Sequence, residues 1–261
     1  MKKNLENKLG DNLRQDIPSL AMFLTAGYPT LDATCDLVLA LEDGGADLVE
    51  IGMPFSDPLA DGPVIQHAST SALRNGVTLP WTLECVRRIR DRSSLPLVLM
   101  GYLNPILRYG EERFFRDAAE AGVDGLILPE LPLEEWSRVA RRIEAADLAG
   151  ILLVAPTTPP DRVKTIDESS SGFLYCVSTT GVTGGTVSRE MMGDIRRIKS
   201  SVCKNPMLVG FGISSPEKAA EFAEVADGVI VGTALLRRLD ENGSSRDITS
   251  WVSGFRRALS S

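Results

Sequence analysis

Short apolar runs alternate with longer amphipathic stretches along nearly the whole chain. These runs predict eight β-strands, at Leu20–Thr25, Leu48–Ile51, Leu97–Met100, Gly125–Leu128, Gly150–Val154, Phe173–Val177, Met207–Gly210 and Gly228–Val231. Most are apolar at consecutive positions rather than at alternate ones, which is typical of strands in a parallel sheet that helices cover on its outer face.

The stretches between these runs carry apolar residues at helical spacing, with charged residues on the opposite face. They predict helices over Thr30–Asp43, Leu79–Arg92, Glu111–Ala121, Leu133–Ala146, Ser188–Ser200 and Pro216–Val225, and a less regular one over Asp161–Ser170. A shorter helix is expected over Thr233–Leu239, and the polar segment Met1–Asp16 predicts an amphipathic helix ahead of the first strand.

A short echo precedes three of the predicted strands, in Gly45-Ala46-Asp47, Gly122-Val123-Asp124 and Val225-Ala226-Asp227. Each places a small residue and an aspartate in a turn at the amino end of a strand. With 261 residues and no linker, the pattern predicts one α/β domain over residues 1–261, a (β/α)8 TIM barrel with an extra N-terminal helix. An open doubly wound sheet is the alternative, which the absence of a G-x-G-x-x-G motif after the first strand disfavours.

Composition and charge remove several classes of function. The net charge of -7 without a clustered basic face argues against nucleic acid as a partner. The polar N-terminus and the lack of a long apolar run predict neither a signal peptide nor a membrane span, so a cytoplasmic protein is expected. The four cysteines are far apart and predict reduced core residues, and the single histidine, His67, cannot supply a histidine-rich metal centre, so no metal is expected.

The most informative stretch is the segment that follows the second predicted strand, from Glu50 to Pro63. It places a carboxylate at the end of an apolar strand and continues into a loop rich in proline, glycine and aspartate, including Asp61. An irregular, charged loop after a buried strand is typical of an active site on a barrel, although a glutamate at a strand end more often serves as a cap or in an ion pair.

Other positions at predicted strand ends fall on the same face of a barrel. Tyr102 and Tyr175 do so, although a buried tyrosine is equally compatible with simple packing. Glycines recur late in the chain in Gly181-Val182-Thr183-Gly184-Gly185, Gly210-Phe211-Gly212 and Gly232-Thr233-Ala234. Singly they suit turns, but together, with the Thr233 hydroxyl and a helix N-terminus, they predict a phosphate site. No lysine lies at a predicted strand end, which disfavours an imine mechanism.

These residues carry a resemblance that covers the chain from end to end. The segments Phe23-Leu24-Thr25-Ala26-Gly27-Tyr28-Pro29, Glu50 to Gln66, Asn104-Pro105, Gly181-Val182-Thr183-Gly184 and Gly210-Phe211-Gly212-Ile213-Ser214 are similar to those of the tryptophan synthase α subunit family. The resemblance implies a carbon–carbon lyase that cleaves indole-3-glycerol phosphate to indole and glyceraldehyde 3-phosphate. It also implies an α2β2 heterotetramer with a β subunit that carries pyridoxal phosphate (PLP) and receives the indole, with no cofactor in this chain.

The resemblance also implies roles for individual residues. Glu50 matches the catalytic glutamate, Asp61 the catalytic aspartate and Tyr175 a tyrosine beside the substrate. The indole pocket would be lined by Phe23, Leu128 and Phe211, and Tyr102 and Thr183 would complete the substrate site. Thr183, in the loop 179–188, is expected to meet Asp61, in the loop 53–62, only when both loops close on binding of substrate and the β subunit. The phosphate would bind among Gly184, Gly185, Gly212, Gly232 and Thr233.

Three residues depart from the family pattern. Thr233 stands where serine is usual, Glu130 stands where aspartate is usual in a Pro-Asp-Leu-Pro motif, and Thr179 replaces an arginine of some relatives. The change at Glu130 bears on communication between subunits, and the change at Thr179 bears on loop closure. Three other interpretations remain: a stand-alone lyase, a regulatory barrel with weak chemistry, and a phosphosugar isomerase or epimerase on the same scaffold.

Overall fold

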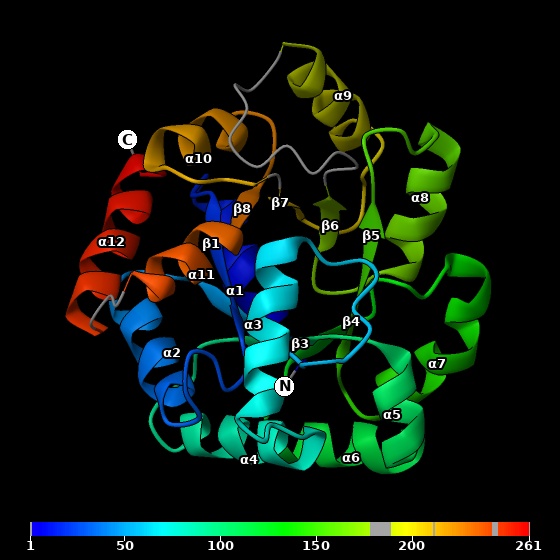
Figure 1. The fold of residues 1–261 in the computed structure, drawn as a ribbon. Helices are drawn as coiled ribbons and strands as arrows, with labels where there is room; N and C mark the ends of the chain where they lie inside the picture. Colours follow the sequence, from blue (N-terminus) through cyan, green and yellow to red (C-terminus); the bar gives the residue numbers. More distant parts are fainter. Residues whose placement is uncertain (1, 178–188, 211, 242–244, 261) are drawn as a thin grey trace.

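The computed structural model describes residues 2–177, 189–210, 212–241 and 245–260, and within them eight parallel strands close into a barrel in sequence order, β1 to β8 (Figure 1). The strands are β1 (Ser19–Thr25), β2 (Leu48–Gly52), β3 (Leu97–Met100), β4 (Gly125–Ile127), β5 (Ala149–Val154), β6 (Leu174–Val177), β7 (Met207–Gly210) and β8 (Gly228–Val231). The predicted (β/α)8 barrel is therefore confirmed.

Helices surround the barrel, as Figure 1 shows. They are α1 (Lys2–Arg14), α2 (Ala33–Asp43), α3 (Pro63–Arg74), α4 (Leu79–Arg90), α5 (Leu103–Tyr109), α6 (Glu111–Ala121), α7 (Leu133–Ala145), α8 (Pro160–Ser169), α9 (Arg189–Lys199), α10 (Pro216–Ala223), α11 (Thr233–Asp240) and α12 (Ser245–Ala258). Among the described residues, no helix is both long and apolar enough to cross a membrane.

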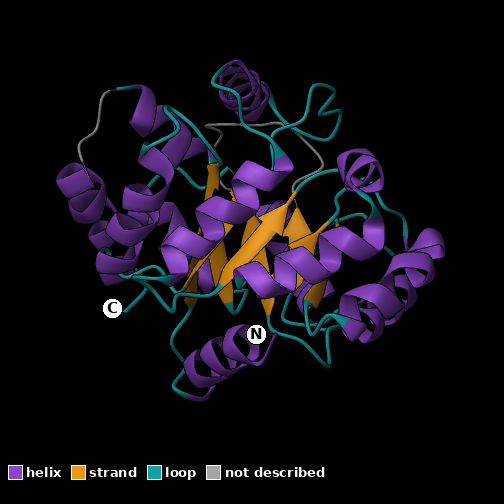
Figure 2. Cartoon of the chain, turned by 90° about the horizontal axis from the view of Figure 1, so that it is seen from below, coloured by secondary structure: helices purple, strands orange, loops and turns teal. Residues whose placement is uncertain are grey.

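Alternation along the strands separates two apolar layers. Side chains at every second position fill the barrel interior, and the intervening ones pack under the helices. The interior layer consists of Ala21, Leu48, Val98, Ile127, Ala149, Ile151, Phe173, Tyr175, Leu208 and Ile230. Leu5 and Leu9 of α1 join it from below, both almost fully buried, so the predicted N-terminal helix closes the amino end of the barrel (Figure 2).

The predicted turns with aspartate lie at this closed end and link the strands in pairs. Each carboxylate accepts a backbone N–H at the start of the preceding strand and forms an ion pair with a basic side chain of a helix. Asp47 accepts Leu20 N at 2.8 Å and pairs with Arg256 and Lys8. Asp124 accepts Leu97 N at 2.8 Å and pairs with Arg90. Asp227 accepts Met207 N at 2.7 Å and pairs with Lys199. In this way β1 is tied to β2, β3 to β4, and β7 to β8.

Three helices, α3, α5 and α12, lie outside the predicted helix ranges. Helix α5 is seven residues long and contains Pro105, so it is too short to show a helical period. Helix α12 buries Ile248, Val252 and Phe255 at helical spacing against α2 and α10, but serine, threonine and glycine interrupt that pattern in the sequence. The C-terminal helix thus completes the layer that covers β1 and β8.

Candidate active site

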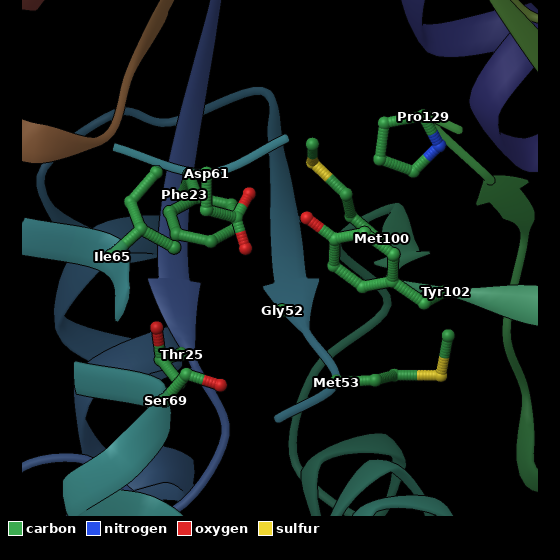
Figure 3. A pocket seen from close by; sticks show the side chains of 11 residues that line it. Phe23, Thr25, Gly52, Met53, Asp61, Ile65, Ser69, Met100, Tyr102 and Pro129 are labelled. Carbon is green, nitrogen blue, oxygen red and sulfur yellow. The ribbon is translucent and has the colours of Figure 1, made fainter. Parts of the chain in front are cut away.

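A pocket opens at the carboxyl ends of β1 to β4, the edge at which the strand arrowheads lie in Figure 2. Its walls come from three strands, from α3 and from the loops that follow β2, β3 and β4. They are formed by Phe23, Thr25, Gly52, Met53, Asp61, Ile65, Ser69, Met100, Gly101, Tyr102 and Pro129 (Figure 3). This is the face of the barrel on which the sequence places catalytic groups.

Glu50 lies in the barrel wall just below this pocket. Its register pairs it with Phe23 on β1 and Val98 on β3, and it alternates with the interior residue Leu48, so its side chain points into the barrel. Glu50 is fully buried, and neither of its carboxylate oxygens has a hydrogen-bond partner among the described residues. Burial raises the pKa of Glu50 to about 8, so it holds its proton at neutral pH.

The loop with Asp61 is anchored at several points. Ser69 of α3 accepts the Phe55 N–H at 2.9 Å and Gln66 of α3 donates to the Asp61 carbonyl at 3.0 Å. The Tyr102 hydroxyl accepts the Ala60 N–H at 2.9 Å. These contacts hold the loop over the pocket, although its residues 53–62 form neither helix nor strand.

Asp61 projects into the pocket near Phe23, and Figure 3 shows the Tyr102 hydroxyl on the side of its ring that faces Asp61. Burial raises the pKa of Asp61 to about 6; the hydrogen bond with Tyr102 opposes this rise and the nearby Glu130 carboxylate adds to it. Asp61 is therefore largely ionised at neutral pH while Glu50 is protonated. Two carboxyl groups with separated pKa values can supply an acid and a negative charge at the same pH.

Tyr175 lies across the barrel from the strand that carries Glu50. It lies on β6 in the interior layer and is 9% exposed. Its pKa is raised well above the ordinary value by burial first and then by the charges of Glu50 and Asp61. Both carboxyl groups therefore act on the same hydroxyl, and the three side chains face one region of the barrel interior.

Glycines at strand ends make room for these aromatic rings. A Cβ atom on Gly210 would lie 2.6 Å from the Tyr175 hydroxyl oxygen, and one on Gly52 would lie 2.8 Å from the Phe23 ring. Gly232, the residue after β8, forms the N-cap of α11, and a Cβ atom on it would lie 3.2 Å from the Phe23 side chain. Thr233 is the first residue of that helix. Gly212 follows β7 with a φ of +63°, which favours glycine.

Leu128, predicted to line the indole pocket, is buried just after β4 and borders a neighbouring hollow with Leu131 and Val154. It does not line the pocket that contains Asp61, and its contact with the indole stays a prediction. Thr183, Gly184, Gly185 and Phe211 lie outside the described residues, as does Thr179.

Most of the other residues that line the pocket were not predicted, and two of them, Thr25 and Met100, end strands. Thr25 ends β1, and its buried hydroxyl has no hydrogen-bond partner among the described residues. Met100 ends β3 and lines the pocket beside Tyr102. Their position at strand ends could have indicated a place in the site, but threonine and methionine are also common in protein cores, so the residue types did not distinguish them. Within the described ranges, no group of three or more histidine, cysteine, aspartate or glutamate side chains is placed to hold a metal ion.

The closed barrel, with a protonated and an ionised carboxyl group at its open end, defines an acid–base enzyme of the (β/α)8 class. The sequence model of the tryptophan synthase alpha chain family matches residues 11–252. The chain belongs to the tryptophan synthase alpha chain family, and it is a lyase of tryptophan biosynthesis.

Individual relatives agree over nearly the full length. The chain is 46% identical to the tryptophan synthase alpha chain of Geobacter sp. strain M21 over 243 residues, which are 92% of this chain and 90% of the relative. The crystal structure of tryptophan synthase subunit alpha from Legionella pneumophila superposes with a TM-score of 0.91 at 37% identity and 98% coverage of both chains. A chain of Mycobacterium tuberculosis tryptophan synthase superposes with a TM-score of 0.89 at 37% identity, covering 98% of this chain and 97% of that one.

Proposed function

We propose that this chain cleaves indole-3-glycerol phosphate into indole and glyceraldehyde 3-phosphate, with Glu50 and Asp61 as its catalytic residues. The observation that carries the assignment is the Glu50 carboxyl group, which is fully buried, has no hydrogen-bond partner among the described residues and has a pKa of about 8. A carboxyl group in that state can donate a proton at neutral pH, and bound substrate can supply the polar partner that the carboxyl group lacks.

The proposed reaction moves one proton through Glu50 in two steps. Glu50 first gives its proton to C3 of the indole ring, which leaves the ring as a cation and Glu50 as a carboxylate. The carboxylate then removes the proton from the hydroxyl on the glycerol carbon bonded to the ring. The carbon–carbon bond breaks, its electrons return to the ring, and an aldehyde forms. Glu50 is protonated again at the end of the cycle.

Asp61 and the aromatic residues complete the proposed site. The Asp61 carboxylate accepts the indole N–H and stabilises the ring cation, because its charge lies in a partly buried, low-polarity pocket. Phe23 presents an apolar ring beside Glu50, and Tyr175 lies within the field of both carboxyl groups. The proposed phosphate site combines the N-terminal amides and dipole of α11, the Thr233 hydroxyl and the Gly212 and Gly232 backbone, with Gly184 and Gly185 from outside the described residues.

Family membership implies a β subunit as partner. We propose an α2β2 heterotetramer in which the β subunit carries PLP and consumes the indole, while this chain needs no cofactor. A cytoplasmic location fits such an assembly. Leu59, in the loop that carries Asp61, is 94% exposed, so the loop presents an apolar side chain at the mouth of the barrel.

The test is an assay of indole release from indole-3-glycerol phosphate by the isolated chain and by the chain with a β subunit. Glu50→Gln should reduce indole release by about 10² to 10⁴-fold in both settings, because the change is nearly isosteric but removes the proton-transfer group. Glu120→Gln is the matched control, since Glu120 is 63% exposed on the outer face of α6. Near-normal turnover by Glu50→Gln would refute the assignment, and full activity without the β subunit would identify a stand-alone lyase.

A further inference from the structure

Two cysteines that are far apart in the sequence meet in the outer helical layer. Cys35 on α2 and Cys85 on α4 place their sulfur atoms 3.5 Å apart, and the Cys35 thiol also lies 3.8 Å from the Cys85 carbonyl oxygen. The sequence contains no C-x-x-C motif and predicts four separate thiols, so this pair results from the packing of α2 against α4. Bridging the two sulfurs would require them to approach by roughly 1.5 Å, which side-chain rotation and a small helix shift can supply.

The two thiols differ in access to solvent. Cys35 is partly exposed, whereas Cys85 is 3% exposed beneath it. A small oxidant from solvent therefore reaches Cys35 first, and Cys85 is positioned behind it to attack an oxidised Cys35 sulfur. The other cysteines provide internal references: Cys203 is exposed, contrary to the expectation that all four are core residues, and Cys176 is fully buried.

The charges around the pair favour a thiolate on Cys35. Its pKa is lowered to about 7, first by the hydrogen bond with Cys85 and then by the positive charges of Arg88 and Arg92, against the effects of burial and of Asp36. The pKa of Cys85 is raised by the same hydrogen bond and by burial. Cys35 is therefore the more readily ionised thiol and the nucleophile of the pair.

We propose that Cys35 and Cys85 form a redox-active dithiol that peroxides convert into a disulfide between α2 and α4. This site is separate from the proposed lyase chemistry. The Cys35 thiolate attacks one oxygen of the peroxide, the O–O bond breaks, and Cys35 becomes a sulfenic acid while hydroxide or alkoxide leaves and takes up a proton. The Cys85 sulfur then attacks the Cys35 sulfur, the S–O bond breaks, and the hydroxyl departs with the Cys85 proton as water. Two thiols are oxidised and one peroxide is reduced.

The position of the bridge gives it a link to the active site. The segment from Cys35 to Cys85 contains β2 with Glu50, the loop with Asp61 and all of α3. Neither cysteine lines the pocket. Oxidation would therefore close a covalent loop around the segment that carries both catalytic carboxyl groups without changing a residue that contacts substrate.

The experiment treats the full-length protein with one equivalent of hydrogen peroxide, unfolds it in urea with N-ethylmaleimide present, and maps the cysteines by mass spectrometry without reduction. The expected product is a Cys35–Cys85 cross-linked peptide, with Cys176 and Cys203 recovered as maleimide adducts. Dithiothreitol before alkylation should restore four alkylated cysteines.

Two variants separate the steps. In Cys85→Ser, Cys35 should accumulate as a sulfenic acid that dimedone captures, because the resolving thiol is missing. In Cys35→Ser, Cys85 should remain reduced at the same peroxide dose, because it is buried. The proposal is overturned if Cys203 is oxidised while Cys35 is recovered as its maleimide adduct, if the disulfides join two molecules, or if Cys35 of the Cys85→Ser variant takes up no dimedone. Because mapping of the unsubstituted protein comes first, the result does not depend on how the variants fold.

Discussion

At position 50, a carboxyl group is held inside the barrel with the ring of Phe23 beside it and no polar partner among the described residues. Burial alone accounts for its raised pKa, so the property that makes Glu50 useful for proton transfer also makes its ionisation unfavourable in the folded protein. The same residue therefore links activity and stability, and both can be measured as a function of pH.

The first prediction concerns stability. The pKa of Glu50 rises from 4.5 in the unfolded chain to about 8 in the folded protein, so the folded state holds this proton more tightly. The tighter binding of this proton stabilises the folded state fully below pH 4.5, and this stabilisation is lost as the pH rises to about 8. Glu50→Gln has no ionisable group at this position and avoids this loss. The free energy of unfolding of the variant, minus that of the original chain, should therefore increase by roughly 2 to 4 kcal/mol from pH 5 to pH 8. Urea unfolding at both pH values measures it, with Glu120→Gln as control; a difference that does not change with pH would contradict it.

The second prediction is a bell-shaped dependence of kcat/KM on pH. Asp61 must be ionised to stabilise the ring cation, so activity should rise through a pH of about 6. Glu50 must be protonated to act as the acid, so activity should fall through a pH of about 8. Asp61→Asn should reduce kcat by about 10² to 10³-fold, because it removes a charge that stabilises the transition state, and should abolish the acidic limb. An acidic limb that persists in this variant would belong to the substrate phosphate instead.

A third prediction tests the contact between Gly210 and Tyr175. The Cβ atom of Gly210→Ala would lie 2.6 Å from the Tyr175 hydroxyl oxygen and 2.7 Å from its ring, so the ring must move. Because displacement by about 1 Å in an active site can cost up to 10²-fold, kcat should fall by about 10- to 100-fold. Gly193→Ala on α9 is the matched control, since no atom lies within 4 Å of its Cβ position. Equal activity of the two variants would remove Tyr175 from the proposed site.

At the scale of secondary structure, α11 provides the feature with the clearest test. It begins at Thr233, directly after β8, and its first N–H groups have no partners within the helix. Thr233→Val keeps the shape of the side chain and removes the hydroxyl. It should raise KM for indole-3-glycerol phosphate by about tenfold with little change in kcat, because a hydrogen bond to a charged group is lost in the ground state and the transition state alike.

Thr233→Ser, which keeps the hydroxyl, should behave like the original chain. Inorganic phosphate should inhibit the original chain and Thr233→Ser at similar concentrations and Thr233→Val only at higher ones. An unchanged KM in Thr233→Val would move the phosphate away from the start of α11.

The sequence was sufficient for the barrel because its eight apolar runs are strands that helices cover, and such strands leave a continuous signal. Helix α5 left none because it is short and contains proline. The sequence also predicted that Glu50 and Asp61 lie at the carboxyl edge of the barrel, where Glu50 lies near the end of β2 and Asp61 lines the pocket, while their catalytic roles stay predictions. The sequence could not show which apolar residues of a strand face the barrel interior: Leu126 and Ile127 are equally apolar, and only the structure separates them, with Ile127 in the interior layer and Leu126 in the other. Contacts between distant segments, such as Cys35 with Cys85, likewise depend on packing.

At the scale of the whole molecule, the partner subunit is expected to act through the loop with Asp61. The side chains of Ser69, Gln66 and Tyr102 hold it by a few hydrogen bonds to its backbone, and Leu59 at its centre is exposed, so closure can be stabilised from outside. Binding of a β subunit should therefore raise kcat by shifting the population of closed loops rather than by donating catalytic groups.

Hydrogen exchange measures this fifth prediction. The amides of residues 53–62 should exchange fastest in the free chain, more slowly with a substrate analogue, and most slowly when the β subunit is also bound. The second predicted loop, 179–188, lies outside the described residues, but the same measurement covers it. Equal exchange of residues 53–62 in all three states would exclude coupling through this loop.

Helix α1 closes the amino end of the barrel, and the last helix, α12, also ends away from the open mouth (Figure 2). Both ends of the described chain therefore lie clear of the pocket. A fusion protein, an affinity tag or a solid support could be attached at either end without obstructing the entrance. Attachment through the final turn of α12 is the safer choice for an immobilised catalyst, because Leu5 and Leu9 near the other end fill the interior of the barrel.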